Sequence, residues 1–133
     1  MALAEDSFRR LLRAREAIHA RYAQPLRIDD LAREAALSPF HFLRLFRSGF
    51  GETPHRYLTR VRIEEAKRLL LQGAPVTEVC FEVGFQSLGS FSALFARRVG
   101  TPPTAFRRRL HHFAFAAQRL YVPHCYLQAF SQF

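Results

Sequence analysis

The chain has 133 residues, of which 49% are hydrophobic and 14 are Phe, and this composition excludes a globally disordered protein. Twenty Lys and Arg against 11 Asp and Glu give a formal net charge of +9, which indicates a polyanionic partner, most often nucleic acid and less often an anionic membrane surface. No apolar run approaches the ~18–20 residues that cross a bilayer, the first residues do not have the pattern of a signal peptide, and two cysteines are too few for a disulfide scaffold. We therefore expect a soluble, cytoplasmic protein of one compact domain, or of two very small domains that share a core.

The basic residues are unevenly distributed and nearly all of them are arginine. Residues 1–82 hold 14 basic and all 11 acidic residues, whereas residues 83–133 hold six arginines and no acid. Lys67 is the only lysine. Arginine pairs bidentately with phosphate and with guanine edges, so this bias suits nucleic-acid binding, although the codon usage of a GC-rich genome would produce it equally well.

Hydrophobic periodicity predicts helices along the chain and no convincing strand, so we expect an all-α fold. The first predicted helix covers 8–22 and has an apolar stripe that includes Phe8. Pro25 follows and ends this helix. The further predicted helices cover 28–36, 38 to about 48, 54 to about 71, 76–83, 87 to about 100, and a segment that begins at Pro103.

Capping residues indicate where several of these helices begin and end. Ser38 is followed by Pro39, and a serine N-cap with proline at the first helical position is a strong start signal. We expect Gly49 and Gly51 to end that helix. The helix from 54 to about 71 contains no breaker, so it is expected to be one continuous element of roughly 27 Å at 1.5 Å per residue.

The sequence repeats itself at an offset of 48 residues, which becomes 49 after one inserted residue in the second turn. Residues 28–35 align with 76–83 at the first offset, and Ser38 aligns with Ser87 at the second. Each copy has a short helix, a turn of three or four residues, a capped second helix and a glycine stop, which is the layout of a helix-turn-helix. The sequence therefore predicts two helix-turn-helix subdomains joined by a long linker helix.

In the first copy, the second helix has an apolar face and an opposite, outward face at helical spacing. The apolar face, with Phe42 and Phe46, can pack on Leu31 and Ala35 of the preceding helix. A helix-turn-helix turns the outward face toward the major groove of DNA, where Arg44 can hold guanine through two hydrogen bonds. The residues expected to face bases are Phe40, Leu43 and Arg44, and those expected to contact phosphate are Ser38, His41 and Arg47. Phe40 and Leu43 either contact thymine methyl groups or form extra core under a neighbouring helix.

In the second copy, the outward face has no long hydrogen-bonding side chain. The residues expected to face bases are Leu88, Gly89, Ser92 and Ala93, and those expected to contact phosphate are Ser87, Ser90, Arg97 and Arg98. Such a face lets the helix approach DNA closely but reads little by direct hydrogen bonding. The alternative is that this helix is structural and contacts no bases. Either way we expect lopsided specificity, with the sharper half-site read by the first copy.

The segment Gly84–Arg108 resembles the signature of AraC/XylS-type transcription regulators. The matching residues are Gly84, Phe85, Ser87, Phe91, Phe95, Gly100, Pro103, Phe106 and Arg107. The first copy, LAREAALSPFHFLRLFRSGFGETPHRYL, and the linker segment RIEEAKRLL are similar to the same family. The sequence departs from the family pattern at Leu88, Gly89 and Ala93, where polar or basic residues are common.

The resemblance implies a bacterial DNA-binding domain over 8–108, with helix-turn-helix units at about 28–49 and 76–98 and a linker helix at about 54–71. It implies that both units enter successive major-groove segments on one face of double-stranded DNA. It also implies activation or repression of a promoter, often through contact with RNA polymerase. We expect a short member of the family without a sensor domain, bound to DNA as a monomer and with no membrane partner.

The tail, 109–133, lies outside the signature and is rich in aromatic residues, so we expect it to fold back on the basic domain or to contact a partner. The spacing of His111, His112, His124 and Cys125 fits no compact set of zinc ligands, and we expect no metal and no cofactor. Cys80 is expected to be a small core residue. No paired carboxylates, glycine-rich phosphate loop or nucleophile–base pair indicates an enzyme. The alternatives to a specific regulator are a weakly specific architectural nucleic-acid binder and a protein-interaction module that uses the aromatic tail.

Overall fold

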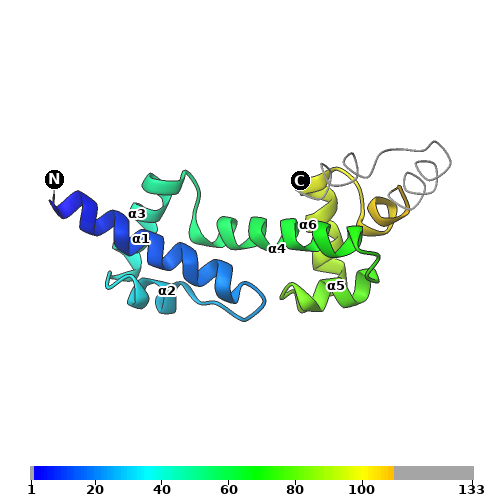
Figure 1. Ribbon diagram of the computed structural model, residues 1–133, viewed down its shortest axis with the longest axis horizontal. Coiled ribbons are helices and arrows are strands. Elements are labelled where there is room, and N and C mark those ends of the chain that lie inside the picture. The colour runs from blue at the N-terminus through cyan, green and yellow to red at the C-terminus, as the bar shows by residue number, and fades with distance from the viewer. Residues whose placement is uncertain (1, 110–133) are drawn as a thin grey trace. The chain divides into compact units, whose positions relative to one another are not determined.

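The computed structural model describes residues 2–109, which are helical apart from the connecting turns and loops (Figure 1). The helices are α1 (Ala2–Arg21), α2 (Ile28–Glu34), α3 (Pro39–Phe50), α4 (Pro54–Leu71), α5 (Val76–Glu82) and α6 (Leu88–Val99), followed by a helical segment at 103–109. No strand occurs among these residues, in agreement with the predicted all-α fold. None of these helices combines the length and the apolar character needed to cross a membrane. Residues 110–133, and with them the predictions for His111, His112, His124 and Cys125, lie outside the described part of the chain.

The chain divides into two compact units, and the boundary between Ile63 and Glu64 lies within α4. In each unit an entering helix precedes a helix-turn-helix pair, and a further helix follows the pair. Helix α4 follows the pair α2–α3 and precedes the pair α5–α6, over the span that the sequence predicts for the linker helix. The prediction of two helix-turn-helix subdomains joined by one long helix is confirmed.

The core of the first unit is built on Phe42 and Phe46, which lie one turn apart on α3 and are fully buried. Their ring centroids are 5.6 Å apart, and the ring of Phe46 lies 5.6 Å from that of Tyr57 on α4. Such edge-to-face pairs contribute stability beyond the area that they bury. Leu31 and Ala35 belong to the same buried cluster, so the predicted packing of α3 on the preceding helix is confirmed.

The second unit repeats this construction with Phe91 and Phe95 on α6. Both side chains are fully buried, with 5.7 Å between their ring centroids. Phe106 of the segment 103–109 lies 5.4 Å from Phe95, at the place that Tyr57 occupies beside Phe46 in the first unit. Cys80 on α5 is fully buried, and burial raises the pKa of its thiol, as expected for a core residue.

Helix α1 begins at Ala2, earlier than the predicted start at Phe8. Residues 2–7 contain no glycine or proline, and an ion pair of 2.8 Å between Asp6 and Arg10 supports the added turn. The prediction that Phe8 lies on the buried stripe is wrong, because its side chain is 52% exposed. The buried cluster of the first unit begins one turn further on, at Leu11.

The glycines near the end of α3 have different roles. Gly49 does not end the helix, as the sequence suggested, but lies inside it, where an added Cβ would approach Cδ1 of Leu11 to 3.0 Å. Its missing side chain therefore allows α1 and α3 to pack closely. Gly51 ends α3 with a φ of 76°, and Gly100 ends α6 in the same way with a φ of 94°.

An arginine from the following helix braces each unit. In the first unit, Arg62 of α4 donates from Nε to the carbonyl of Tyr22 at 2.7 Å and from Nη2 to that of Gln24 at 3.0 Å. Burial lowers the pKa of the Arg62 guanidinium. In the second unit, Arg107 donates from Nη2 to the carbonyl of Gly73 at 2.9 Å. Both arginines hold the loop through which the chain enters the helix-turn-helix.

Two glycine substitutions with opposite expected signs test this account of the helix ends. Gly51→Ala should lower the free energy of unfolding by about 1 kcal/mol, because alanine is strained at a positive φ even though open space surrounds the position. Gly89→Ala should raise stability by less than about 1 kcal/mol, because Gly89 lies in the first turn of α6 with no atom nearer than 3.8 Å to an added Cβ. Urea unfolding followed by circular dichroism measures both, and equal signs would contradict the assignment.

Candidate nucleic-acid interface

The second helix of each helix-turn-helix begins with a serine N-cap and has no acidic residue in its first turn. The hydroxyl of Ser38 accepts a hydrogen bond from the backbone N–H of His41, and that of Ser87 accepts one from Ser90, both at 3.3 Å. Helices α3 and α6 have no acidic residue in the first turn, whereas α2 and α5, the first helices of the two pairs, have Asp29, Asp30 and Glu78 there. The amino ends of α3 and α6 therefore suit an anion better than those of their partners.

The outward face of α3 carries the side chains that the sequence proposed for DNA contact. Phe40 is 71% exposed, so the alternative that it forms extra core is wrong. Arg44 is also exposed, and its guanidinium carbon lies 5.8 Å from the centroid of the Phe40 ring. Leu43 is half-buried, and His41 and Arg47 are exposed. The roles of these residues on DNA stay predictions.

The outward face of α6 carries mainly small side chains, in contrast to that of α3. Leu88 is 41% exposed, Gly89 and Ala93 are exposed, and Ser92 is half-buried. Ser90 is exposed, and Arg97 and Arg98 project from the last turn, where they also lie near the negative end of the helix. In the repeat, Gly89 and Ala93 occupy the positions of Phe40 and Arg44. The second unit thus lacks the long side chains that the first presents.

Several basic side chains of the described residues form ion pairs, whereas the arginines of α3 and α6 do not. The pairs with acidic side chains are Arg10 with Asp6, Arg21 with Glu34, Arg33 with Asp30, Arg60 with Glu52, Lys67 with Glu64 and Arg68 with Glu65. On α3 and α6, by contrast, Arg44, Arg47, Arg97 and Arg98 have no acidic partner within residues 2–109. The uncompensated positive charge therefore includes the two helices expected to meet DNA.

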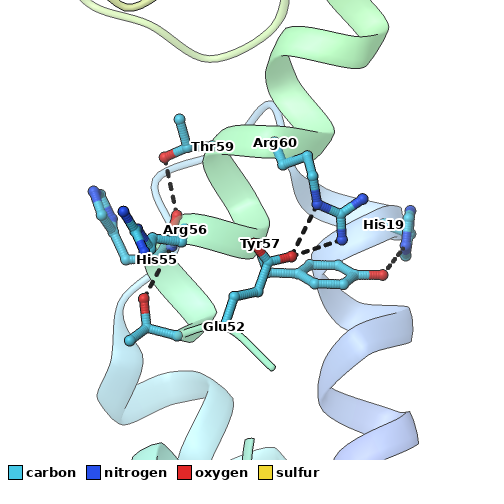
Figure 2. A network of polar contacts seen from close by, with 8 residues as sticks. His19, Glu52, His55, Arg56, Tyr57, Thr59 and Arg60 are labelled. Carbon is cyan, nitrogen blue, oxygen red and sulfur yellow. Dashed lines mark hydrogen bonds and ion pairs between the residues drawn. The ribbon is translucent and has the colours of Figure 1, made fainter. Parts of the chain in front are cut away.

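A polar network fixes the first part of α4 against α1 (Figure 2). Nε2 of His19 and the hydroxyl of Tyr57 are 2.7 Å apart, and the guanidinium of Arg60 lies 4.7 Å from the Tyr57 ring. Arg60 also donates to Oε1 of Glu52 at 2.9 and 2.7 Å. Because Tyr57 also packs on Phe46, this network supports the buried face of α3. No local pattern in the sequence predicts this network, since His19 and Tyr57 are 38 residues apart.

Within residues 2–109, no three His, Cys, Asp or Glu side chains lie close enough together to hold a metal ion.

Comparison with known proteins agrees with this geometry. A family model described as a helix-turn-helix domain matches residues 31–109. The HTH-type transcriptional regulator YobQ of Bacillus subtilis (strain 168) is 34% identical over 95 residues, which are 71% of this chain and 39% of the relative. A putative AraC-like transcription regulator of Streptomyces lividans is 36% identical over 92 residues, which are 68% of this chain and 30% of the relative. The chain thus spans well under half the length of these curated relatives.

Solved structures show the same fold. An AraC-type transcriptional regulator from Chromobacterium violaceum has a TM-score of 0.72 and 27% identity, over 78% of this chain and 94% of that one. The DNA-binding domain of AdpA, solved in complex with a target DNA, has a TM-score of 0.66 and 31% identity, over 85% of this chain and 95% of that one. The chain belongs to the helix-turn-helix family of AraC/XylS-type transcription regulators.

Replacing Arg44 on α3 should cost more binding free energy than replacing Ser92, a small hydrogen-bonding residue expected to face bases from α6. We expect Arg44→Ala to weaken binding to a selected DNA site by roughly 1–3 kcal/mol and to relax preference at one base pair, because a bidentate contact is lost. Ser92→Ala should cost much less, since serine makes a single hydrogen bond. Fluorescence anisotropy titrations compare the variants. Equal losses for Arg44→Ala and Ser92→Ala would contradict the assignment of Arg44.

Proposed function

We propose that this chain is a sequence-specific, DNA-binding transcription regulator that inserts α3 and α6 into successive major-groove segments of double-stranded DNA. The observation that carries the proposal is the exposed, acid-free outward face of both helices, with four arginines that have no acidic partner within residues 2–109. Membership of the family supports it, as does the relative AdpA, whose DNA-binding domain was solved with a target DNA.

The assigned contacts are of two kinds: contacts to base edges, which read the sequence, and contacts to phosphates, which hold the DNA backbone. Phe40, Leu43 and Arg44 would face bases from α3, and Leu88, Gly89, Ser92 and Ala93 would do so from α6. Phosphates would be held by Ser38, His41 and Arg47 in the first unit and by Ser87, Ser90, Arg97 and Arg98 in the second. Because α6 presents mainly small side chains, the second unit would hold the backbone more than it reads sequence.

Two helix-turn-helix units in one chain provide two half-site contacts without a second subunit, so the chain would bind as a monomer. Contact with RNA polymerase, which the resemblance to AraC/XylS regulators implies, would couple binding to transcription. Selection of sites from a random duplex library tests the proposal: one sharp and one blurred half-site supports it. Diffuse enrichment without a motif would favour a weakly specific architectural binder instead.

Binding should depend steeply on salt, because phosphate contacts release counterions from DNA. If about three further arginines join Arg47, Arg97 and Arg98 at the phosphates, which makes about six, the slope of log K against log salt should be near −5. A slope shallower than about −2 would contradict groove binding. Replacing both Arg97 and Arg98 with Ala should reduce the slope by about 2. Arg21→Ala removes the same kind of charge from an arginine that Glu34 already holds, and it should leave the slope unchanged.

A further inference from the structure

An exposed aromatic ring and an exposed arginine lie together on the face of α3 that is proposed to meet DNA. Phe40 is 71% exposed, more than any other large hydrophobic side chain in the described part of the chain. The guanidinium carbon of Arg44, one helical turn later, lies 5.8 Å from the Phe40 ring centroid, within the range of a cation–π contact. The core of the unit does not use this ring, because Phe42 and Phe46 on the opposite face already fill it.

The contact restricts how Arg44 can present its guanidinium. A guanidinium that holds O6 and N7 of guanine must lie flat in the plane of that base. A ring that stays against such a guanidinium lies at the level of the adjacent base pair. There the C5 position of a pyrimidine projects into the major groove, and in thymine it carries a methyl group, the one apolar feature of that groove.

We propose that Phe40 and Arg44 form one reading element for a two-base step: Arg44 holds a guanine, and Phe40 packs on the methyl group of an adjacent thymine and positions Arg44. The inference rests on the proposed function and deepens it, because it names the base step that the first helix-turn-helix prefers. Phe40 thereby acts both as a methyl contact and as a positioning residue for Arg44.

The second copy of the repeat shows that the fold does not require this pair. Gly89 and Ala93 stand at the equivalent positions of α6, while Phe91 and Phe95 preserve the buried pair of the first copy. An aromatic ring and an arginine at these two positions are therefore dispensable for packing. Their presence on α3 alone fits a role in binding and assigns the two-base step to one half-site.

The experiment removes a single methyl group from the DNA and a single ring from the protein. Sites are first selected from a random duplex library with the full chain, and the thymine next to the preferred guanine is then replaced by deoxyuridine. Wild type should bind the deoxyuridine duplex about fourfold more weakly, the factor expected for one buried methyl group. Phe40→Ala should bind both duplexes equally, and Phe40→Tyr, which keeps the ring, should restore the difference. Replacing the thymine by cytosine should weaken wild-type binding, and 5-methylcytosine should recover part of the loss.

The positioning role has its own measurement. In Phe40→Ala the preference for guanine over adenine at the neighbouring position should also fall, because Arg44 loses the ring that orients it. Phe81→Ala is the matched control: it removes another exposed ring, 55% exposed on α5, and should leave both preferences intact. Thermal unfolding of both variants should match wild type, since neither ring is buried.

The outcomes separate this inference from the function on which it rests. Suppose that a motif is selected, but that replacing its thymine by deoxyuridine weakens binding by the same factor for wild type and Phe40→Ala. That result would overturn the inference and leave the proposed function standing. A motif with no thymine beside its guanine would do the same. The absence of any enriched motif would overturn the proposed function, and the inference with it.

Discussion

Two pairs of phenylalanines, each one helical turn apart, determine how this protein can face a ligand. Phe42 and Phe46 bury one side of α3, and Phe91 and Phe95 bury one side of α6. Burying a phenylalanine side chain stabilises a fold by about 1.5–3 kcal/mol, so rotating either helix about its axis would cost several kcal/mol. Because residues on a helix keep a fixed angular spacing, this burial places Phe40 and Arg44 of α3, and Gly89 and Ala93 of α6, on the outward faces.

The two units share this construction and differ in what they present. Both have a serine cap on the second helix and a glycine in the left-handed conformation at its end. The turns also match: Ala36 and Gly84, which are equivalent in the repeat, both have positive φ values, 55° and 99°. Within this shared frame, the first unit offers an arginine stacked on an aromatic ring, and the second offers glycine and alanine. Under the proposed function, the repeated fold would therefore serve two different roles, with base recognition by the first unit and backbone contact by the second.

The arginines of the described residues also differ in their partners. Those that hold the fold together are matched to carboxylates or to backbone carbonyls, as Arg60 is to Glu52 and Arg62 to Tyr22 and Gln24. Arg44 and Arg47 on α3, and Arg97 and Arg98 in the last turn of α6, have no acidic partner within residues 2–109. A charge left unpaired on the surface costs little in water and can attract a polyanion, whereas a charge held in an ion pair is already partly compensated by its acidic partner.

The sequence by itself determined the helices, their caps and the internal repeat, because these depend on local spacing: Ser38 and Ser87 cap their helices, and Phe42 and Phe46 lie on the buried face as predicted. Local signals were weaker at the helix ends. The tertiary structure placed Gly49 inside α3, where it faces Leu11 of α1, and it left Phe8 exposed because the buried cluster begins at Leu11. It also brought His19 and Tyr57 together and excluded a core role for Phe40. These features depend on contacts between segments far apart in the chain, or on which surface remains uncovered, and no local pattern of residue types contains that information.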